Sequence, residues 1–376
     1  MEIYLDNAAT TRVCTEAADI AYKVMTDCYG NPSSTHTKGR DAKAYLDTAR
    51  AQIASALGCS ASEVYFTSCG SESDVWAITR GAESAARRGR HIISSAVEHD
   101  AVQKTLEELE SRGFEVTYLS PEKDGSVSAD AVKAALREDT ILVTLMMVNN
   151  ETGGITDIAA IAKMLKGCGS KALLHTDAVQ GFMKVPFSAK KLGADMISIS
   201  GHKIHAPKGI GALYIKTGVK IKPLIRGGAQ EGGMRAGTEA MPQIAAFGKA
   251  AEIAFSGMKD NCDTMASLRA LAMSTICADI PEAQIIGGGA PHILSVSLPG
   301  WRSEVLMNFL EAEGIYVSRS SACKKGGRSH VLEAMRLPAQ VIDGAIRVSF
   351  SRYNTEDDVL ALCSALKRAH DTLAHR

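Results

Sequence analysis

The sequence lacks the cysteine pairs that mark metal and redox sites. It contains nine cysteines, but no two of them form a C-x-x-C pair. Neither a zinc site nor a redox dithiol is therefore indicated. An odd number of irregularly spaced cysteines predicts free thiols, which persist in a reducing compartment.

The chain also lacks an excess of charge of either sign. Its 42 basic residues balance 42 acidic residues, so the formal net charge is zero. Nucleic-acid-binding proteins and polybasic membrane binders both depend on a positive field. The composition therefore argues against both classes.

Long apolar runs are missing as well. The longest, Ile141–Val148, is interrupted by Thr144, whereas a membrane-spanning helix needs about 20 residues. The first ten residues have no basic region followed by an apolar stretch, so they do not resemble a secretory signal. No repeat, low-complexity tract or charged tail stands out. We expect a soluble, cytoplasmic protein.

The chain is long enough for a substantial core. It has 376 residues, of which 45% are hydrophobic. Two or three domains, or one large α/β domain with an appendage, are consistent with this length.

Short apolar runs alternate with longer segments of helical spacing through the first two thirds of the chain. This alternation predicts a mostly parallel sheet with helices on both faces. Only residues 201–211 join the last two runs, which is shorter than the dozen or so residues of a parallel crossover, so an antiparallel hairpin is expected there. The expected strands are 64–67, 91–94, 115–119, 140–148, 172–176, 196–200 and 212–215, and the expected helices are 41–57, 72–87, 101–111, 129–136 and 158–166.

The pattern changes after Pro242. One long helical stretch is expected at 243–280, and a mixture of short strands and helices follows it, at 293–298, 303–313, 315–317, 345–350 and from Thr355 onward. This pattern predicts a second, smaller α+β domain. We expect residues 15–254 to form the large domain, and residues 1–14 with 255–376 to form the small one.

Lys203 is the first candidate for chemistry. It follows an apolar strand in the segment Ser200-Gly-His-Lys203, which leads into a turn rich in glycine and proline. Ligands of open α/β sheets bind beyond the carboxyl ends of the strands, and a lysine there can form a Schiff base with a carbonyl. A surface lysine in an ordinary turn is the alternative.

Two other strand ends carry compatible groups. Asp177 directly follows an apolar strand, and a buried carboxylate needs a cationic partner. A protonated pyridine nitrogen meets that need, although a helix cap or a salt bridge explains Asp177 equally well. Ser71 is expected to cap a helix whose free N–H groups could bind phosphate. Polar clusters also follow strands at 97–99 and 148–151.

Taken together, these segments resemble the class V aminotransferase family of pyridoxal-phosphate enzymes, and specifically the cysteine desulfurases of the NifS/IscS type. The resemblance runs almost from end to end and is specific because the motifs occur in the same order. The matching segments are 4–11, 30–36, Glu98-His99, 148–151, 177–180, 198–203, 234–238, 320–323 and 346–355.

The resemblance implies a fold and an activity. The fold is that of α/β, aspartate-aminotransferase-like, fold type I transferases, with a mostly parallel seven-stranded sheet in the large domain and a smaller α+β domain. The implied enzyme converts L-cysteine to L-alanine and transfers sulfur, as a persulfide on Cys323, to an acceptor protein. An iron–sulfur scaffold or a tRNA-thiolation enzyme is the expected acceptor. A cytoplasmic homodimer with shared active sites is implied, without a metal and without direct binding to nucleic acid or membrane.

The resemblance also implies a role for each site residue. The catalytic residues are Lys203, which binds pyridoxal phosphate as a Schiff base and moves the Cα proton, His99, which lies on the cofactor ring, and Cys323. Asp177 keeps the pyridine nitrogen protonated, which makes the ring an electron sink. Gln180 and Asn150 lie at the phenolic oxygen, and the phosphate is held by Gly70, Ser71, Ser200, His202 and, from the neighbouring subunit, Thr238. Arg347 binds the substrate carboxylate through its fork of donors, supported by Asn31 and Asn150.

Cys323 lies among small residues, glycines and cations. Lys324, Lys325, Arg328 and His330 are expected to favour its thiolate, the nucleophilic form. The same charges could instead form a solvated surface or a docking site for an acidic acceptor.

Several positions depart from the family pattern. Cys69 replaces a glycine, Gly232 and Ala236 replace an arginine and a serine, and Arg319-Ser320 replaces Thr-Gly. The segment after Cys323 is two residues shorter than in many relatives, so sulfur delivery is expected to depend more on how the partner docks. A selenocysteine lyase, another aminotransferase of this fold and a non-catalytic interaction subunit are the alternative functions.

Overall fold

The computed structural model describes residues 2–319 and 328–373. Its largest element is a seven-stranded sheet in the order β2-β8-β7-β6-β5-β3-β4. Neighbouring strands are parallel except β8, which runs antiparallel to both β7 and β2. The predicted sheet and its antiparallel hairpin are therefore confirmed. The strands are β2 (Val64–Thr67), β3 (His91–Ser95), β4 (Glu115–Leu119), β5 (Thr140–Met146), β6 (Leu173–Asp177), β7 (Met196–Ser200) and β8 (Gly211–Ile215).

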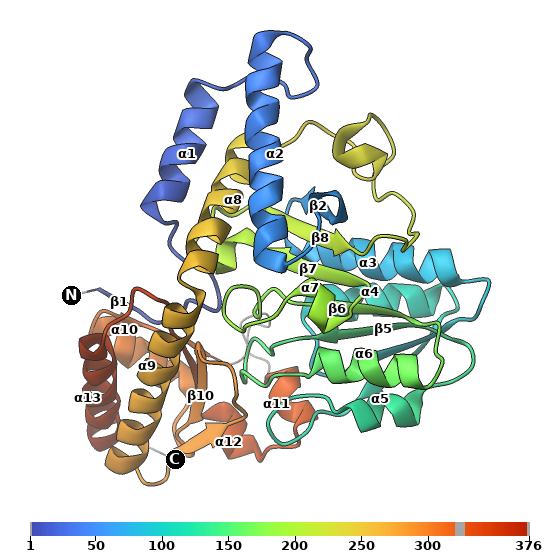
Figure 1. Cartoon of the computed structure of the whole chain (residues 1–376). Helices are drawn as coiled ribbons and strands as arrows, with labels where there is room; N and C mark the ends of the chain where they lie inside the picture. Colours follow the sequence, from blue (N-terminus) through green and yellow to red (C-terminus); the bar gives the residue numbers. More distant parts are fainter. Residues whose placement is uncertain (1, 320–327, 374–376) are drawn as a thin grey trace.

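Helices cover both faces of this sheet (Figure 1). Because side chains alternate along a strand, neighbouring residues of β3 face opposite layers. Ile92 belongs to a buried cluster with Trp76 and Leu106, whereas Ile93 belongs to a second cluster with Ile161. The helices between the strands are α3 (Gly70–Ala85), α4 (Asp100–Ser111), α5 (Ala129–Ala135), α6 (Ile158–Gly167) and α7 (Ala189–Leu192).

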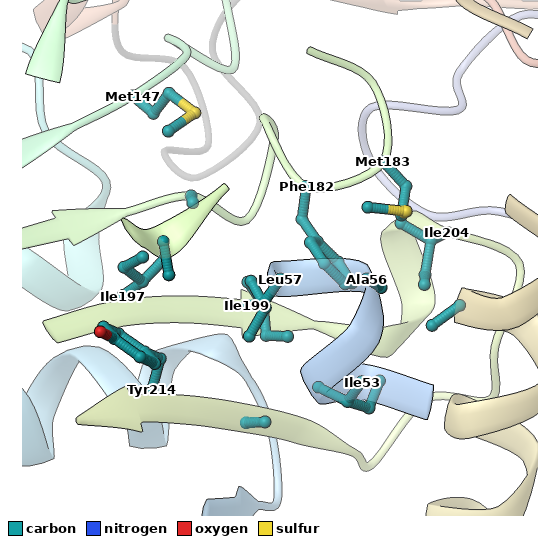
Figure 2. Packing of buried hydrophobic residues seen from close by; sticks show 14 of the residues in the cluster. Ile53, Ala56, Leu57, Met147, Phe182, Met183, Ile197, Ile199, Ile204 and Tyr214 are labelled. Carbon is teal, nitrogen blue, oxygen red and sulfur yellow. The ribbon is translucent and has the colours of Figure 1, made fainter. Parts of the chain in front are cut away.

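Three further helices pack together beside the sheet: α1 (Thr15–Thr26), α2 (Thr37–Leu57) and α8 (Met241–Ser256). The C-terminal end of α2 enters the main core, where Ile53 and Leu57 lie in one cluster with Phe182 and Ile199 (Figure 2). This packing fixes the loop after β6, which holds Phe182, against the layer of β7. Both segments contribute to the site described below.

A separate layer contains the C-terminal part of the chain. Its four-stranded antiparallel sheet has the order β12-β13-β10-β9. Strand β1 (Ile3–Tyr4) pairs in parallel with β11 (Ile315–Tyr316), so the N-terminus joins this layer. Its own core includes Ile3 and Leu5 together with residues from Met265 onward. The other elements are β9 (Gln284–Ile286), β10 (Ile293–Ser297), α10 (Ser303–Ala312), β12 (Ser318–Arg319), α11 (His330–Ala334), α12 (Ala339–Asp343), β13 (Ala345–Ser349) and α13 (Glu356–Thr372).

The single helix expected at 243–280 is wrong. Helix α8 ends at Ser256, and α9 (Met258–Asp279) begins after Gly257. Glycine in a helix interior costs about 1 kcal/mol relative to alanine, and the two halves pack into different cores. Ile244 belongs to the core of the seven-stranded sheet, whereas Leu268 belongs to the core of the smaller layer. The exact boundary between domains stays a prediction.

Among the described residues, no helix combines the length and the apolar composition that crossing a membrane requires.

Candidate active site

A cavity of about 350 Å³ lies at the carboxyl ends of the sheet strands. This is the edge at which open α/β sheets bind ligands. Segments from both ends of the chain close the cavity, including Ala8, Ala9 and residues 328–330. The predicted site residues that line it are Gly70, Ser71, His99, Asn150, Asp177, Gln180, Ser200, His202, Lys203 and Arg347.

Two predicted site residues that the structure describes do not line the cavity. Thr238 and Asn31 are both exposed, and the Asn31 carboxamide oxygen accepts a hydrogen bond from the backbone N–H of Ser33 at 2.9 Å. Cys323 lies outside the described residues. The roles expected for these and all other predicted site residues stay predictions.

Lys203 lies in a short 3₁₀ turn directly after β7. Its Nζ atom donates to the carbonyl oxygens of Ala8 and Ala9, at 2.6 and 2.8 Å. The turn requires Gly201, because a Cβ atom there would lie 2.7 Å from Cγ2 of Ile210. The fold thus places a primary amine in the cavity wall and orients it with two carbonyl groups from the N-terminal segment.

Asp177 ends β6 and is only 6% exposed. One carboxylate oxygen accepts a hydrogen bond from the backbone N–H of Val179 at 2.8 Å. Burial raises the pKa of Asp177, mainly because the ionised carboxylate has lost its water. A protonated pyridine nitrogen in the cavity would supply the cation that this carboxylate needs.

Three more buried carboxyl groups, those of Asp74, Glu98 and Glu151, line the cavity and were not predicted as site residues. Burial and the nearby Asp177 raise the pKa of Asp74 well above its usual range. Burial raises the pKa of Glu98 to about 8, although its Oε1 atom accepts hydrogen bonds from Ser95 and from the backbone N–H of Met146. Glu98 therefore retains its proton at neutral pH.

The N-terminus of α3 forms one end of the cavity. Cys69 is the N-cap and Gly70 begins the helix, so the expectation that Ser71 caps it is wrong. The helix starts earlier because Glu72 reaches back to accept a hydrogen bond from the backbone N–H of Ser68 at 3.1 Å. The Cys69 side chain makes no capping hydrogen bond, which leaves the first-turn N–H groups for a ligand.

Ser200 adds a second donor at the same end. Its Oγ atom is buried and has no hydrogen-bond partner among the described residues. Gly70 keeps this end open, because a Cβ atom there would lie 2.7 Å from Cγ2 of Val179 and 3.4 Å from Cβ of Ser200. Free helix N–H groups and an unpartnered hydroxyl fit a phosphate group. With Lys203 and Asp177, this donor set fits pyridoxal phosphate.

Two histidines line the cavity in different ways. His202 is neutral, because burial, assisted by nearby lysines, lowers its pKa to about 4. His99 is the N-cap of α4, and its Nδ1 atom accepts a hydrogen bond from the backbone N–H of Ala101 at 3.1 Å. Nδ1 is thus an acceptor, so Nε2 is the ring nitrogen that carries the proton in the neutral imidazole.

Gln180 and Arg347 tie the cavity walls to the N-terminal segment. The Gln180 amide donates to the Ala8 carbonyl at 2.8 Å. Arg347, on β13, is only 3% exposed and donates to the Asn150 carbonyl at 2.8 Å and to the Asp6 carboxylate at 2.9 Å. Its Nε atom is buried without a partner among the described residues, which leaves donor capacity for a carboxylate.

Residues 328–330 are engaged in contacts that the sequence did not reveal. Arg328, which was expected to favour the thiolate, forms a two-point ion pair with Asp343 at 2.8 and 2.9 Å. Ser329 donates to the Glu151 carboxylate at 2.5 Å, and the His330 ring lies 3.1 Å from the Glu98 carbonyl. The only feature of the sequence that pointed to these contacts is that two of the partner residues, Glu98 and Glu151, lie just past predicted strands.

Comparison with known proteins gives consistent similarities. Residues 3–362 match the family model described as Aminotransferase class-V. The chain is 43% identical over 362 residues to the cysteine desulfurase IscS of Methanosarcina thermophila, covering 95% of this chain and 89% of that protein. It is 44% identical to a cysteine desulfurase of Trichormus azollae, covering 95% and 90%. The solved structure of a NifS-like protein superimposes with a TM-score of 0.93 at 38% identity, covering 99% of this chain and 100% of that one.

Proposed function

We propose that Lys203 and Cys323 divide the chemistry of this enzyme between them. The chain belongs to the class V aminotransferase family and is a pyridoxal-phosphate-dependent cysteine desulfurase. The observation that carries this proposal is the Lys203 amine, which lies in a cavity that also contains the Asp177 carboxylate and the free N-terminus of α3. Together these groups match the aldehyde, the ring nitrogen and the phosphate of one cofactor.

The residues that would hold pyridoxal phosphate follow from this match. Lys203 would bind its aldehyde carbon and Asp177 would pair with its ring nitrogen. The first turn of α3, with Ser71, and the Ser200 hydroxyl would hold its phosphate, assisted by His202. Once bound, the cofactor withdraws electrons from the substrate Cα and so makes the Cα–H bond acidic.

The remaining steps belong to the chain's own groups. Arg347 holds the carboxylate of L-cysteine, which orients the Cα–H bond toward Lys203. The Lys203 amine removes the Cα proton, and His99, whose Nδ1 is occupied by Ala101, has Nε2 available to assist proton transfer.

Cys323 completes the reaction. Its thiolate attacks the substrate sulfur, so that an S–S bond forms and the substrate C–S bond breaks. The electron pair of that bond stays with the carbon fragment, which takes up a proton and leaves as L-alanine. The sulfur remains as a persulfide on Cys323. The net change is L-cysteine plus one thiol to L-alanine plus one persulfide, so no external oxidant or reductant is needed.

The persulfide passes to an acceptor protein, for which an iron–sulfur scaffold or a tRNA-thiolation enzyme is the expected type. A cytoplasmic location fits this role, and all eight described cysteines are free thiols, as a reducing compartment requires.

The enzyme acts as a homodimer with shared sites. Thr238 is exposed and lies away from the cavity of its own chain, as expected if it reaches the cofactor phosphate of a second copy. Three large apolar side chains on α1 and just after it are also strongly exposed, Tyr22 at 67%, Met25 at 55% and Tyr29 at 68%, which is typical of an interface. Sedimentation equilibrium should show a dimer, and a monomer would contradict this part of the proposal.

The assay that tests the function measures alanine and sulfide released from L-cysteine in the presence of a thiol reductant. Lys203→Ala is expected to abolish both products. Cys323→Ser is expected to abolish both as well, while still binding L-cysteine with a change in cofactor absorbance. Full sulfide production by either variant would overturn the assignment. Parallel turnover of selenocysteine separates a desulfurase from a selenocysteine lyase.

A further inference from the structure

A tight turn follows β5 and is fixed by the buried side chain of Asn149. Its Oδ1 atom accepts hydrogen bonds from the backbone N–H groups of Glu151 and Thr152, both at 2.9 Å. Its Nδ2 atom donates to the Val97 carbonyl at 3.0 Å. The turn is therefore held rigidly against the segment that follows β3.

Two contacts lead from this turn to the proposed reaction groups. Arg347 donates to the carbonyl of Asn150 at 2.8 Å. The next residue, Glu151, accepts the hydroxyl proton of Ser329 at 2.5 Å. Glu151 is 6% exposed and Ser329 is 2% exposed, so water does not compete effectively for this hydrogen bond. The turn thus forms one hydrogen bond with the substrate-binding Arg347 and another with Ser329.

Ser329 is the buried member of three anchors that follow Cys323 in the sequence. The neighbouring Arg328–Asp343 ion pair has side chains 46% and 44% exposed, and exposed ion pairs contribute little to stability. His330 contacts a backbone carbonyl, that of Glu98. Ser329 also caps α11, because its Oγ atom accepts a hydrogen bond from the backbone N–H of Leu332 at 3.1 Å. Its hydroxyl therefore connects α11 to the Glu151 carboxylate.

We propose that Glu151 is a positioning residue for sulfur transfer: through its hydrogen bond it fixes Ser329, which follows Cys323 in the sequence, in the cavity wall that also contains the substrate-binding Arg347. This inference rests on the proposed role of Cys323. Glu151 lines the cavity, and the role assigned to it acts through its hydrogen bond to Ser329.

The expected consequence is specific to one step. Attack of one sulfur on another requires close alignment, and a misplacement of about 1 Å can cost about 100-fold in rate. Substrate binding at Arg347 depends on the guanidinium and its two acceptors, which remain when the Glu151 side chain is changed. Loss of the Glu151–Ser329 hydrogen bond is therefore expected to lower kcat while leaving KM for L-cysteine nearly unchanged.

The test compares four variants of the full-length holoenzyme. Glu151→Ala removes the acceptor and Ser329→Ala removes the donor, whereas Ser329→Thr keeps a hydroxyl. Glu63→Gln is the matched control: Glu63 is buried, accepts hydrogen bonds from the backbone N–H and hydroxyl of Thr217, and lies away from the cavity. The measurements are kcat, KM, the thermal unfolding midpoint and single-turnover persulfide formation on Cys323.

We expect Glu151→Ala and Ser329→Ala to slow persulfide formation about 10- to 100-fold at nearly constant KM, with activity restored in Ser329→Thr. The control Glu63→Gln should lower only the unfolding midpoint. Unchanged kcat in both alanine variants would overturn the inference. So would a joint change in kcat, KM and unfolding midpoint, because a purely structural role produces that pattern. If Cys323→Ser retains sulfide production, the proposed function fails; if Cys323→Ser is inactive and Glu151→Ala is fully active, only this inference fails.

Discussion

The guanidinium of Arg347 and the carboxylate of Asp6 form an ion pair with an Nη2–Oδ1 distance of 2.9 Å. This contact joins β13, near the end of the chain, to the segment that follows β1. The Asn150 carbonyl accepts from the other terminal nitrogen, Nη1. The plane of the guanidinium is therefore set from two sides before any substrate arrives.

The first prediction follows from this fixed plane. Arg347→Lys replaces a fork of donors by a single ammonium group, which cannot bind a carboxylate at two points. Hydrogen bonds to charged groups contribute about 1.5–3 kcal/mol, so kcat/KM for L-cysteine should fall about 10- to 100-fold, mainly through KM. Steady-state kinetics measure the effect. An unchanged KM would show that Arg347 does not bind the substrate. Asp6→Asn should raise KM less, because the arginine remains and only its orientation is relaxed.

The second prediction concerns the unpartnered hydroxyl of Ser200. If it donates to the cofactor phosphate, Ser200→Ala should raise the dissociation constant for pyridoxal phosphate about tenfold, the effect of one charge-assisted hydrogen bond. Thr176→Ala is the matched control, because Thr176 on the adjacent strand also has a buried, unpartnered hydroxyl but does not line the cavity. Absorbance titration of the cofactor-free protein gives both constants. Equal affinities in the two variants would contradict the phosphate site.

The third prediction concerns pH and Glu98. Its pKa rises from 4.5 to about 8 in the folded protein, chiefly through burial. Between these values the unfolded chain has released the proton that the folded chain retains. The contribution of Glu98 to stability is thus fully present below pH 4.5 and is lost as pH rises toward 8, by at most about 1.4 kcal/mol per pH unit. Glu98→Gln should remove this slope.

Urea unfolding of the cofactor-free wild type and of Glu98→Gln at several pH values from 5 to 8 measures this difference. The free energy of unfolding of the variant minus that of the wild type should increase as pH rises. If the two free energies keep a constant difference over this range, Glu98 ionises normally in the folded state and the prediction is wrong.

Local patterns in the sequence predict most of the large sheet. Strands β2, β4 and β7 have the predicted bounds, and the short link 201–211 correctly predicts the antiparallel β8. The break at Gly257 was missed because apolar residues continue on both sides of it. Tertiary structure causes α8 to end at this point, because α8 and α9 pack into different cores.

In the site too, local sequence patterns predict some features and tertiary packing determines the others. Asp177 and Ser200 end apolar strands and Lys203 closely follows one, so their common location at the carboxyl edge of the sheet could be predicted from the strands alone. The Lys203–Ala8 and Arg347–Asp6 contacts join residues 195 and 341 positions apart. No local pattern encodes such pairs. Glu151 and Ser329 illustrate the same limit, because a buried hydrogen bond across 178 positions depends on how the C-terminal layer packs against the large sheet.

The proposed mechanism depends most on which thiol receives the sulfur. Incubation of the enzyme with L-cysteine in the absence of an acceptor, followed by alkylation, proteolysis and mass spectrometry, locates the added sulfur atom directly. We predict a persulfide on the peptide that contains Cys323, and none in Lys203→Ala. A persulfide on Cys69, the described cysteine that lines the cavity, with Cys323 unmodified would contradict it.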